Sequence, residues 1–441
     1  QLVTTMGVRY LNTLITTRCK RAITPTHFSK YRGTTIVVDT SIYVYKYLSE
    51  NTLMESMYFM MAQFRFYDIT PIFVFDGVPP PEKHLALKER DASKKTAEIK
   101  YRATEQMILQ LQMKKQEQSQ REQLQQEQLQ QEQPQQEQPQ QEQPQQEQPQ
   151  DRYGDRDDND NGSDVDADDV CENGEDAANA KIERAINGLC GLRKRCIRVH
   201  RCEIASVKRL MRAFDMRYIE ADGEADVMCA QIVKIGVAQA CMSDDMDMFL
   251  FGCPRVLRHI NLISGTWVEY DLNQILRRLD VSISGFREIC ILSGTDYNID
   301  NFEPCARCRV YLSDIFDSYY KFCEHGISDV GDVGNDCAEP NDAFYEWMKQ
   351  RNSLFHHIDI AALKRVYQLF SAKLTSVQIQ NLNSVLMINN GEGGHASPHR
   401  ADGVAGGARR PLCGCNEELE KSFEVPGRVK KLMAQYNFIY I

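Results

Sequence analysis

The chain has 441 residues, of which 42% are hydrophobic and 26% are charged. This length predicts two or three domains, and the apolar fraction is sufficient for a core. No apolar stretch approaches the roughly 18–20 residues that a membrane-spanning helix needs, and the start QLVTTMGVRYL lacks the basic and apolar blocks of a secretory signal. We therefore expect an intracellular protein that does not contact a membrane.

The net charge of −10 is unevenly distributed along the chain. Residues 111–180 carry 19 acidic and 5 basic side chains, a net charge of −14, so the rest of the chain carries +4. A slightly basic body with an acidic insert is compatible with a polyanionic partner, although it does not demonstrate one.

The 15 cysteines favour reduced, buried thiols over a disulfide framework, because their number is odd and several lie in apolar segments. Two local pairs could suggest zinc, but neither has a second pair at the spacing of a zinc finger or ribbon. The two pairs are Cys305 with Cys308 and Cys413 with Cys415. Cys323 and His325 are the only nearby residues that could complete a site.

The first predicted elements are two short strands, TTIVVDTS at 34–41 and PIFVFDG at 71–77, with a helix at 53–67 between them. Both strands are rich in β-branched and aromatic residues, and each ends in an aspartate. Further on, helices are predicted at 207–216 and 223–236.

Two more strands follow, VAQACMS at 237–243 and RVLRHINL at 255–262, and the pattern turns helical after about residue 284. Alternating strands and helices predict an α/β fold, in which helices cover both faces of a mostly parallel sheet. Such folds bind ligands at the carboxyl ends of their strands.

A long insert interrupts this pattern. Residues 116–150 are seven Gln-rich pentads, and an Asp-rich run follows. The Leu-containing pentads could prolong the preceding helix, whereas the prolines at five-residue intervals and the aspartates predict disorder until about Ala180. Those prolines are Pro134, Pro139, Pro144 and Pro149.

Seven acidic residues recur at the predicted strand ends and in nearby loops. They come from five separate stretches of the sequence and are Asp39, Asp76, Glu224, Asp226, Asp245, Asp247 and Asp296. If the segment after the strand at 237–243 is extended, Asp245 and Asp247 share one side and Met246 and Met248 the other.

Unpaired carboxylates repel one another unless cations compensate them, and Mg²⁺ prefers carboxylate oxygens. Two such ions suit the hydrolysis of a phosphodiester. Each acid also has a simpler interpretation: Glu224 and Asp226 as acids of a first helical turn, Asp76 as a turn residue, and Asp39 as a cap. We expect Asp244 to be exposed or a supporting partner. The full set is what these simpler interpretations leave unexplained.

The motifs that contain these acids resemble the flap endonucleases, the structure-specific 5′ nucleases that include the XPG-type enzymes. MGVRYLNTLI, VVDTSIYVYKYL and PIFVFDGVPPPEK resemble the family's N-terminal block, and YIEADGEADVMCAQIV, SDDMDMFLFGCPRVLRH and REICILSGTDYN its internal block. The resemblance covers roughly residues 6–105 and 190–300 and implies a PIN-like 5′ nuclease fold with a helical arch.

Carried onto this chain, the resemblance implies that the seven acids hold two Mg²⁺ ions, for which Mn²⁺ could substitute. Asp76, Glu224 and Asp226 would favour one ion and Asp245, Asp247 and Asp296 the other, with Asp39 more remote. The implied reaction is hydrolysis of a DNA phosphodiester that leaves a 5′-phosphate.

The resemblance also implies roles for basic and aromatic residues. Lys83 and Arg90 match a basic pair that contacts the scissile phosphate, and Tyr45 matches an aromatic on which a base stacks. The simpler interpretation of Lys83 and Arg90 is a solvated, lysine-rich helix face, and we expect Lys88, Lys94 and Lys95 to belong to such a face. The simpler interpretation of Tyr45 is a core position. The arch would contribute Arg193, Lys194, Arg195 and Arg198, for which a nuclear localisation signal is the alternative.

The sequence departs from the family pattern in three places. Asp76 and Glu224 are 148 positions apart, about twice the expected spacing, because the insert lies between them. No glycine occurs between Asn298 and Cys308, where the family grips duplex DNA with a Gly-rich hairpin. The tail MAQYNFIYI has no convincing sliding-clamp peptide, and the form resembles those of large DNA viruses or protists.

These observations predict five regions. They are an N-terminal nuclease block at 6–105, a disordered insert at 106–180, an internal nuclease block at 181–300, a helical DNA-binding-like region at 301–388, and a flexible linker and tail at 389–441.

The first hypothesis is a monomeric Mg²⁺-dependent 5′ nuclease for DNA flaps or single-strand/duplex junctions in replication, repair or recombination. It would act in the nucleus or at a viral replication site. An XPG-type bubble endonuclease and a 5′–3′ exonuclease stay open, as does an RNA-directed 5′ exonuclease. The hypothesis from another class is a non-catalytic scaffold with a nuclease fold.

Overall fold

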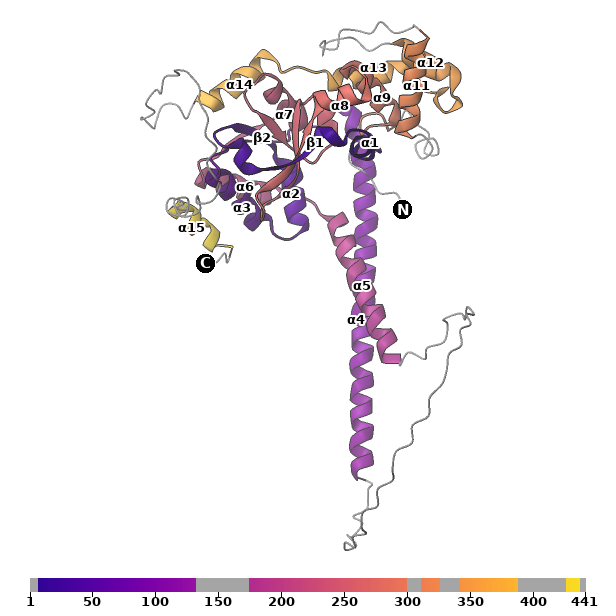
Figure 1. Ribbon diagram of the computed structural model, residues 1–441. Coiled ribbons are helices and arrows are strands. Elements are labelled where there is room, and N and C mark those ends of the chain that lie inside the picture. The colour runs from indigo at the N-terminus through magenta and orange to yellow at the C-terminus, as the bar shows by residue number, and fades with distance from the viewer. Residues whose placement is uncertain (1–6, 132–173, 300–310, 326–341, 388–425, 437–441) are drawn as a thin grey trace, which may run out of the picture. The chain divides into compact units, whose positions relative to one another are not determined.

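The computed structural model describes residues 7–131, 174–299, 311–325, 342–387 and 426–436 (Figure 1). The chain divides into two compact units, Gln1–Lys94 with Ile197–Ile441, and Lys95–Cys196. We call them the sheet unit and the helical unit.

A seven-stranded mixed sheet forms the centre of the sheet unit, in the order β1-β7-β6-β5-β2-β3-β4. The neighbours from β6 to β4 are parallel, while β7 runs antiparallel to both β6 and β1. The strands are β1 (Ile23–His27), β2 (Thr35–Asp39), β3 (Thr70–Phe75), β4 (Arg217–Glu220), β5 (Ala240–Met242), β6 (Arg255–Asn261) and β7 (Thr266–Asp271).

Alternate residues of the central strands enter two different cores, as the two-residue period of a strand requires. In β2, Val37 belongs to one buried cluster, and Ile36 and Val38 belong to the other. Both faces of the sheet are thus covered by helices, which is why the parallel strands are apolar throughout.

The helices of the first core surround the face of Val37, and those of the second pack on the opposite face. The first set comprises α1 (Leu11–Arg18), α7 (Ala225–Lys234), α8 (Leu272–Leu279), α9 (Ile283–Ser293), α11 (Leu312–Glu324), α12 (Asp342–Arg351) and α13 (Ile360–Phe370). The second set comprises α2 (Thr40–Ser49), α3 (Leu53–Phe66), α6 (Arg201–Ala213) and α15 (Gly427–Ala434). Helix α14 (Ser376–Met387) lies against β4.

Five short 3-10 turns connect these elements within the described residues. They are η1 (Lys20–Ala22), η2 (Phe28–Tyr31), η3 (Pro81–Lys83), η4 (Asp247–Phe249) and η6 (Ser353–Phe355). No helix in the described part of the chain is both long and apolar enough to cross a bilayer.

The helical unit contains the greater part of α4 (His84–Gln131) and α5 (Gly174–Cys196). On α4, Ala97 and Ile108 are buried, with half-buried residues between them at steps of three and four. On α5, Ile182, Ala185 and Leu189 form a similar half-buried stripe. This spacing is that of a coiled-coil seam.

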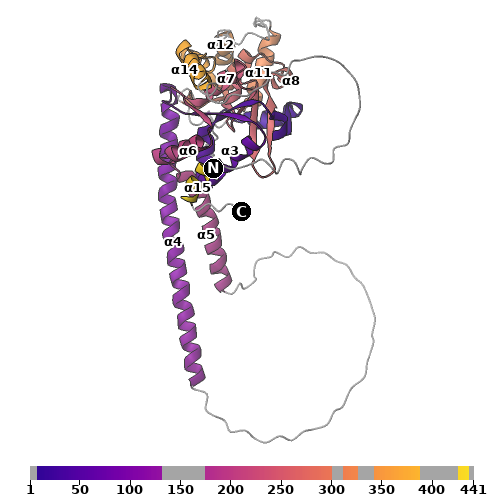
Figure 2. The same cartoon turned by 90° about the vertical axis from the view of Figure 1, so that its left-hand side faces the viewer.

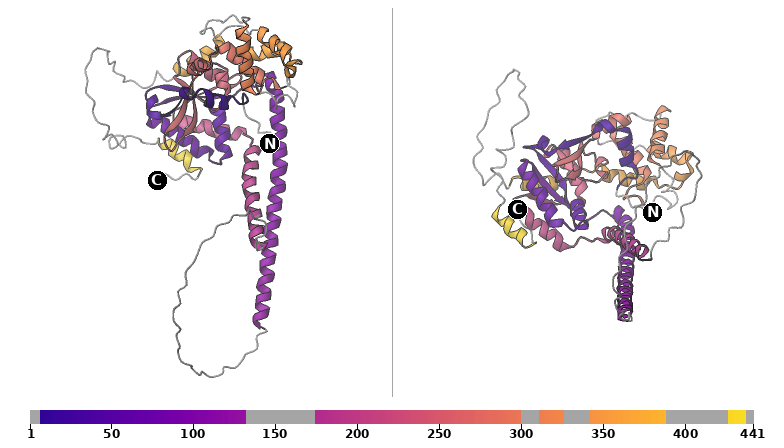
Figure 3. Two further views of the ribbon diagram at one scale, coloured as in Figure 1. Left: turned by 45° about the vertical axis from the view of Figure 1, so that its right-hand side comes forward. Right: turned by 60° about the horizontal axis from the view of Figure 1, so that its bottom comes forward.

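Two contacts fix the direction of the helix pair. Lys115 Nζ donates to Asn179 Oδ1 at 2.7 Å. The pKa of the Cys196 thiol is raised mainly by burial and also by the nearby Glu98 carboxylate. Because the contact moves toward the N-terminus on one helix as it moves toward the C-terminus on the other, α4 and α5 are antiparallel, as the views in Figures 2 and 3 also show.

The α/β class, the mostly parallel sheet, the flanking helices and the helical C-terminal part are therefore confirmed. The Leu-containing pentads do prolong α4, as far as Gln131, and α5 begins at Gly174, six residues before the predicted return of order. The five predicted regions stay a prediction.

Candidate active site

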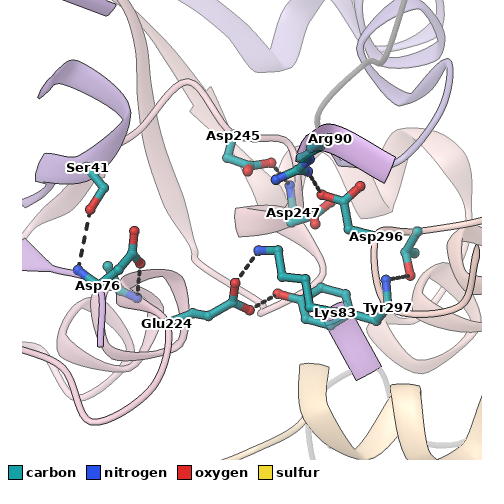
Figure 4. A network of polar contacts seen from close by, with 11 residues as sticks. Ser41, Asp76, Lys83, Arg90, Glu224, Asp245, Asp247, Asp296 and Tyr297 are labelled. Atoms are coloured by element: carbon teal, nitrogen blue, oxygen red, sulfur yellow. Dashed lines mark hydrogen bonds and ion pairs between the residues drawn. The ribbon is translucent and has the colours of Figure 1, made fainter. Parts of the chain in front are cut away.

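All seven predicted acids lie in the sheet unit, at the carboxyl edge of the parallel strands or in loops beside it. Asp39 is the last residue of β2, Asp76 follows β3, and Asp245 follows β5. Parallel pairing of these strands brings their ends together, because Asp39 lies opposite Val74 in the register. Figure 4 shows five of the acids, with Glu224 directed at Lys83 and Tyr297, and Asp296 directed at Arg90.

Asp39 is buried at the centre of the cluster. Its Oδ2 accepts a hydrogen bond from Ser243 Oγ at 2.8 Å. Burial, together with the carboxylates of Asp76 and Asp245, raises the pKa of Asp39 to about 7. Asp39 interacts electrostatically with Asp76, Asp226 and Asp245. Its greater distance from the two ions stays a prediction.

The loop after β3 positions Asp76 against the start of α7. Asp76 Oδ1 accepts a hydrogen bond from the amide of Ala225 at 2.8 Å. The next residue, Gly77, lies so close to the loop before α7 that an added Cβ would overlap the carbonyl oxygen of Ala221 and lie 2.7 Å from that of Asp222. The missing side chain of Gly77 thus permits the approach of two acidic loops.

Glu224 is held by two side chains from other elements. Lys83 Nζ forms an ion pair with its Oε1, and the hydroxyl of Tyr297 donates to its Oε2. Lys83 Nζ also lies 5.2 Å from the centroid of the Tyr297 ring (Figure 4). Burial alone would lower the pKa of Lys83, but the carboxylates of Glu224 and Asp226 outweigh it and raise that pKa.

The segment after β5 differs from the expected extended conformation. The strand ends at Met242, and Asp247 is already the first residue of η4. The two aspartates converge because the chain turns, with the amide of Asp247 donating to Asp245 Oδ1 at 2.9 Å. Met246 and Met248 are buried, as predicted, so the segment still separates acidic and core sides.

The N-terminal segment closes over these two aspartates. The amide of Val8 donates to Asp247 Oδ1 at 3.0 Å. Gly7 has φ 76°, and a Cβ there would lie 2.7 Å from Asp247 Oδ1 and 2.8 Å from Asp245 Oδ1. Only glycine fits this position without displacing a carboxylate.

The predicted basic pair lies among the acids. Lys83 ends η3, directly before α4, and Arg90 lies in the second turn of that helix. Arg90 forms an ion pair with Asp296, and both cations offset the charge of Asp245. Their placement between carboxylates is the position from which they could meet a bound anion.

The cluster carries more negative charge than its two cations neutralise. Burial and neighbouring carboxylates raise the pKa of Asp226 and of Asp247 well above the ordinary range. A divalent cation would relieve this repulsion, and the oxygen donors suit a hard ion. Across the described residues, however, no three metal-binding side chains stand close enough together to form a ready-made site.

Asp244 points away from the other acids, as expected for a supporting residue. Its Oδ1 accepts a hydrogen bond from the amide of His259 at 2.7 Å. The buried Arg258 donates to the carbonyl oxygen of Asp244 at 2.9 Å and contacts Met246 Sδ, so it fixes the turn that carries the catalytic candidates.

Tyr45 lies on α2 with 44% of its surface exposed. Lys94 Nζ lies 5.0 Å from the centroid of its ring. The exposed ring does not have the core position that was the alternative for Tyr45. Lys94 also does more than line a solvated helix face, because it caps this ring with a positive charge.

The remaining basic candidates are divided between the two units. Arg193, Lys194 and Arg195 lie in the last turn of α5, in the helical unit. Arg198 lies in the sheet unit, where its NH1 forms an ion pair with Asp91 at 2.7 Å. The α5 stretch is the returning limb of an antiparallel helix pair.

Sequence reasoning missed Tyr297 and Ser243, which hold Glu224 and Asp39. Tyr297 directly follows Asp296, and Ser243 lies two residues before Asp245. A search for hydroxyl groups next to the predicted acids would have found both. The Cys305, Cys308, Cys413 and Cys415 candidates and the segment without glycine after residue 299 lie outside the described residues.

Two family models match the chain in the regions that build this site. The XPG N-terminal domain matches residues 6–97, and the XPG I-region matches residues 215–296. The curated relatives include Flap endonuclease 1 of Leishmania major, 38% identical over 107 residues, and of Methanococcus aeolicus, 33% identical over 120 residues. These matches cover 24% and 27% of this chain, and 27% and 37% of the relatives.

The solved structures found by comparison share little sequence with this chain. The catalytic core of Rad2 in complex with DNA substrate has 15% identity and a TM-score of 0.43, covering 90% of this chain and 91% of that one. The flap endonuclease-1 from Methanococcus jannaschii has 16% identity and a TM-score of 0.38, covering 85% and 100%.

The two matched regions contain all seven acids and both cations at the carboxyl edge of the sheet. In these two regions the chain is similar to the XPG-type flap endonucleases. It spans about a quarter to two fifths of the length of the curated relatives named above.

Proposed function

We propose that the chain is a structure-specific 5′ nuclease that hydrolyses DNA phosphodiesters at junctions between single strands and duplex, in replication, repair or recombination. One observation carries the proposal. The seven acids and two cations that the sequence singles out converge at the carboxyl edge of one sheet, although they come from separate segments. A scaffold would have no use for buried, mutually repelling carboxylates.

We propose Mg²⁺ as the cofactor, with Mn²⁺ able to replace it. Asp76, Glu224 and Asp226 would hold one ion, and Asp245, Asp247 and Asp296 the other, with Asp39 more remote. When bound, two such ions supply the charge neutralisation and Lewis acidity that phosphodiester hydrolysis needs.

The protein's own side chains then have defined tasks. Lys83 and Arg90 are placed to exchange their carboxylate partners for the phosphate and to offset the charge that develops on its oxygens. Tyr297 orients Glu224 through its hydroxyl, and Tyr45 presents an exposed face to a base of the strand. Arg193, Lys194, Arg195 and Arg198 would contact phosphates of the single strand.

The site of action that we propose is the nucleus. A viral replication site finds no support among the relatives named above, which come from cellular organisms. We propose a monomer as the active form.

The test is a cleavage panel of 5′-flap, bubble, nicked, single-stranded DNA and RNA substrates with Mg²⁺. Asp245→Asn and Asp296→Asn should lower the single-turnover rate by at least about 100-fold, or about 2.7 kcal/mol. Asp244→Asn is the matched control, because its carboxylate faces His259 rather than the cluster. The panel also separates flap, bubble and exonuclease preferences.

Absence of cleavage on every substrate, or equal rates for Asp245→Asn and the control, would reject catalysis and leave the scaffold alternative. A preference for RNA ends would instead support the RNA-directed exonuclease.

A further inference from the structure

A second pocket lies behind the ring of Tyr297, in the sheet unit. It has a volume of about 300 Å³ and lies between η3, the first turn of α4 and helix α13. Its apolar walls include Leu85 and Val366, and its polar groups include His84, Lys88 and Arg365. None of these residues belongs to the acidic cluster.

The polar groups of the pocket favour an anion. His84 and Lys88 are four residues apart, so they share one face of α4. Arg365 lines the same pocket from α13. Among the described residues its ion-pair partner is Asp359 at 3.9 Å, with both side chains 58% exposed. Within the described chain, Lys88 forms no ion pair.

Two further features set the strength of the attraction. His84 is the first residue of α4, a helix of 48 residues, so the dipole of its N-terminus adds positive potential. Glu82 also lines the pocket and reduces the formal charge of the two permanent cations to +1. The pocket therefore suits a group with one or two negative charges.

The pocket and the acidic cluster share a wall. The ring of Tyr297 lines the pocket, while its hydroxyl donates to Glu224 and its face lies 5.2 Å from Lys83 Nζ. Only the Tyr297 ring would thus separate an anion in the pocket from a phosphate bound by Lys83. Adjacent phosphates of one strand would fit such an arrangement, with Leu85 and Val366 against the sugar or base.

We propose that this pocket binds a phosphate of the nucleic-acid strand next to the phosphodiester that is cleaved. The inference rests on the proposed nuclease function, which supplies the strand. It adds His84 and Lys88 of α4 and Arg365 of α13 as a binding subsite, and neither family model covers α13.

The experiment measures binding rather than cleavage. The affinity of the full chain for fluorescent 5′-flap DNA is determined by anisotropy in EDTA over a range of salt concentrations. Arg365→Ala and Lys88→Ala should each weaken binding by about tenfold, and each should reduce the salt slope by about 0.7–0.9. Glu82→Gln should change affinity in the opposite direction.

The matched control is Lys364→Ala, because Lys364 precedes Arg365 on α13 but pairs with Asp342 and does not line the pocket. It should leave the affinity and the salt slope unchanged. Thermal unfolding of each variant verifies that the fold is intact.

Unchanged affinity and slope in both Arg365→Ala and Lys88→Ala would overturn the proposal. A second outcome would also overturn it: dTMP competes with the DNA for the parent chain, and the variants lose this competition but keep their affinity for DNA. The pocket would then take a free nucleotide instead of a strand. The readout does not require cleavage, so a chain that binds DNA through this pocket but cuts nothing would reject the nuclease function alone.

Discussion

The hydroxyl of Tyr297 offers the sharpest test of how the acidic cluster is held. Tyr297 is 3% exposed, and its only polar atom donates to the Glu224 carboxylate. Tyr297→Phe removes that hydrogen bond and keeps the ring that packs on Lys83 and, edge-on at 5.2 Å, on Phe370. The change therefore isolates one interaction.

A hydrogen bond to a charged group contributes about 1.5–3 kcal/mol. If the hydroxyl holds Glu224 in its working position, this loss corresponds to a single-turnover rate about 10- to 100-fold lower. The Glu224 side chain is 10% exposed, so water replaces the lost donor only in part. Rates on 5′-flap DNA and urea unfolding of both proteins measure the two effects.

Tyr345→Phe is the matched control. The hydroxyl of Tyr345 is buried and lacks a hydrogen-bond partner among the described residues, so its removal should change the stability by less than about 0.5 kcal/mol and leave the rate unchanged. A Tyr297→Phe rate within twofold of the parent, or an equal loss in Tyr345→Phe, would refute the reasoning.

Four further predictions concern other parts of the chain. Gly77→Ala should destabilise by about 1–3 kcal/mol in urea unfolding and slow cleavage, because its Cβ overlaps backbone; unchanged values would show that the loops can separate. Asp280→Gly should stabilise by about 1 kcal/mol, since Asp280 ends α8 at φ 51° with a negative charge at the helix C-terminus. Ile108→Asn should reduce hydrogen-exchange protection in α5, whereas its exposed neighbour Leu109→Asn should not; equal effects would contradict the seam. Mg²⁺ at about 100 times its Kd should stabilise by about 2.7 kcal/mol in a thermal melt, and Asp226→Asn should shrink this gain; an unmoved Tm would argue against a metal at the cluster.

Strands were found from the sequence where both faces of the strand are buried. TTIVVDTS and PIFVFDG became β2 and β3 because central parallel strands need apolar residues throughout. The edge strands β1 and β4 gave no such signal. β1 contains Pro25, which an edge strand tolerates, and β4 is the four-residue segment RYIE.

The sequence by itself identified the acids that gather at one edge of the sheet, because aspartates at the ends of apolar strands have few other reasons to occur together. It did not determine how Asp245 and Asp247 converge, because a strand and a turn place alternate residues differently. The structure has a turn there, which leads into η4, and the amide of Asp247 bonds to Asp245. Nor did it reveal the supports from distant segments, Val8 on Asp247 and Tyr297 on Glu224, because no local pattern records a contact between residues 239 or 73 positions apart. Tertiary structure decided these contacts because they depend on which strand ends meet at one edge of the sheet.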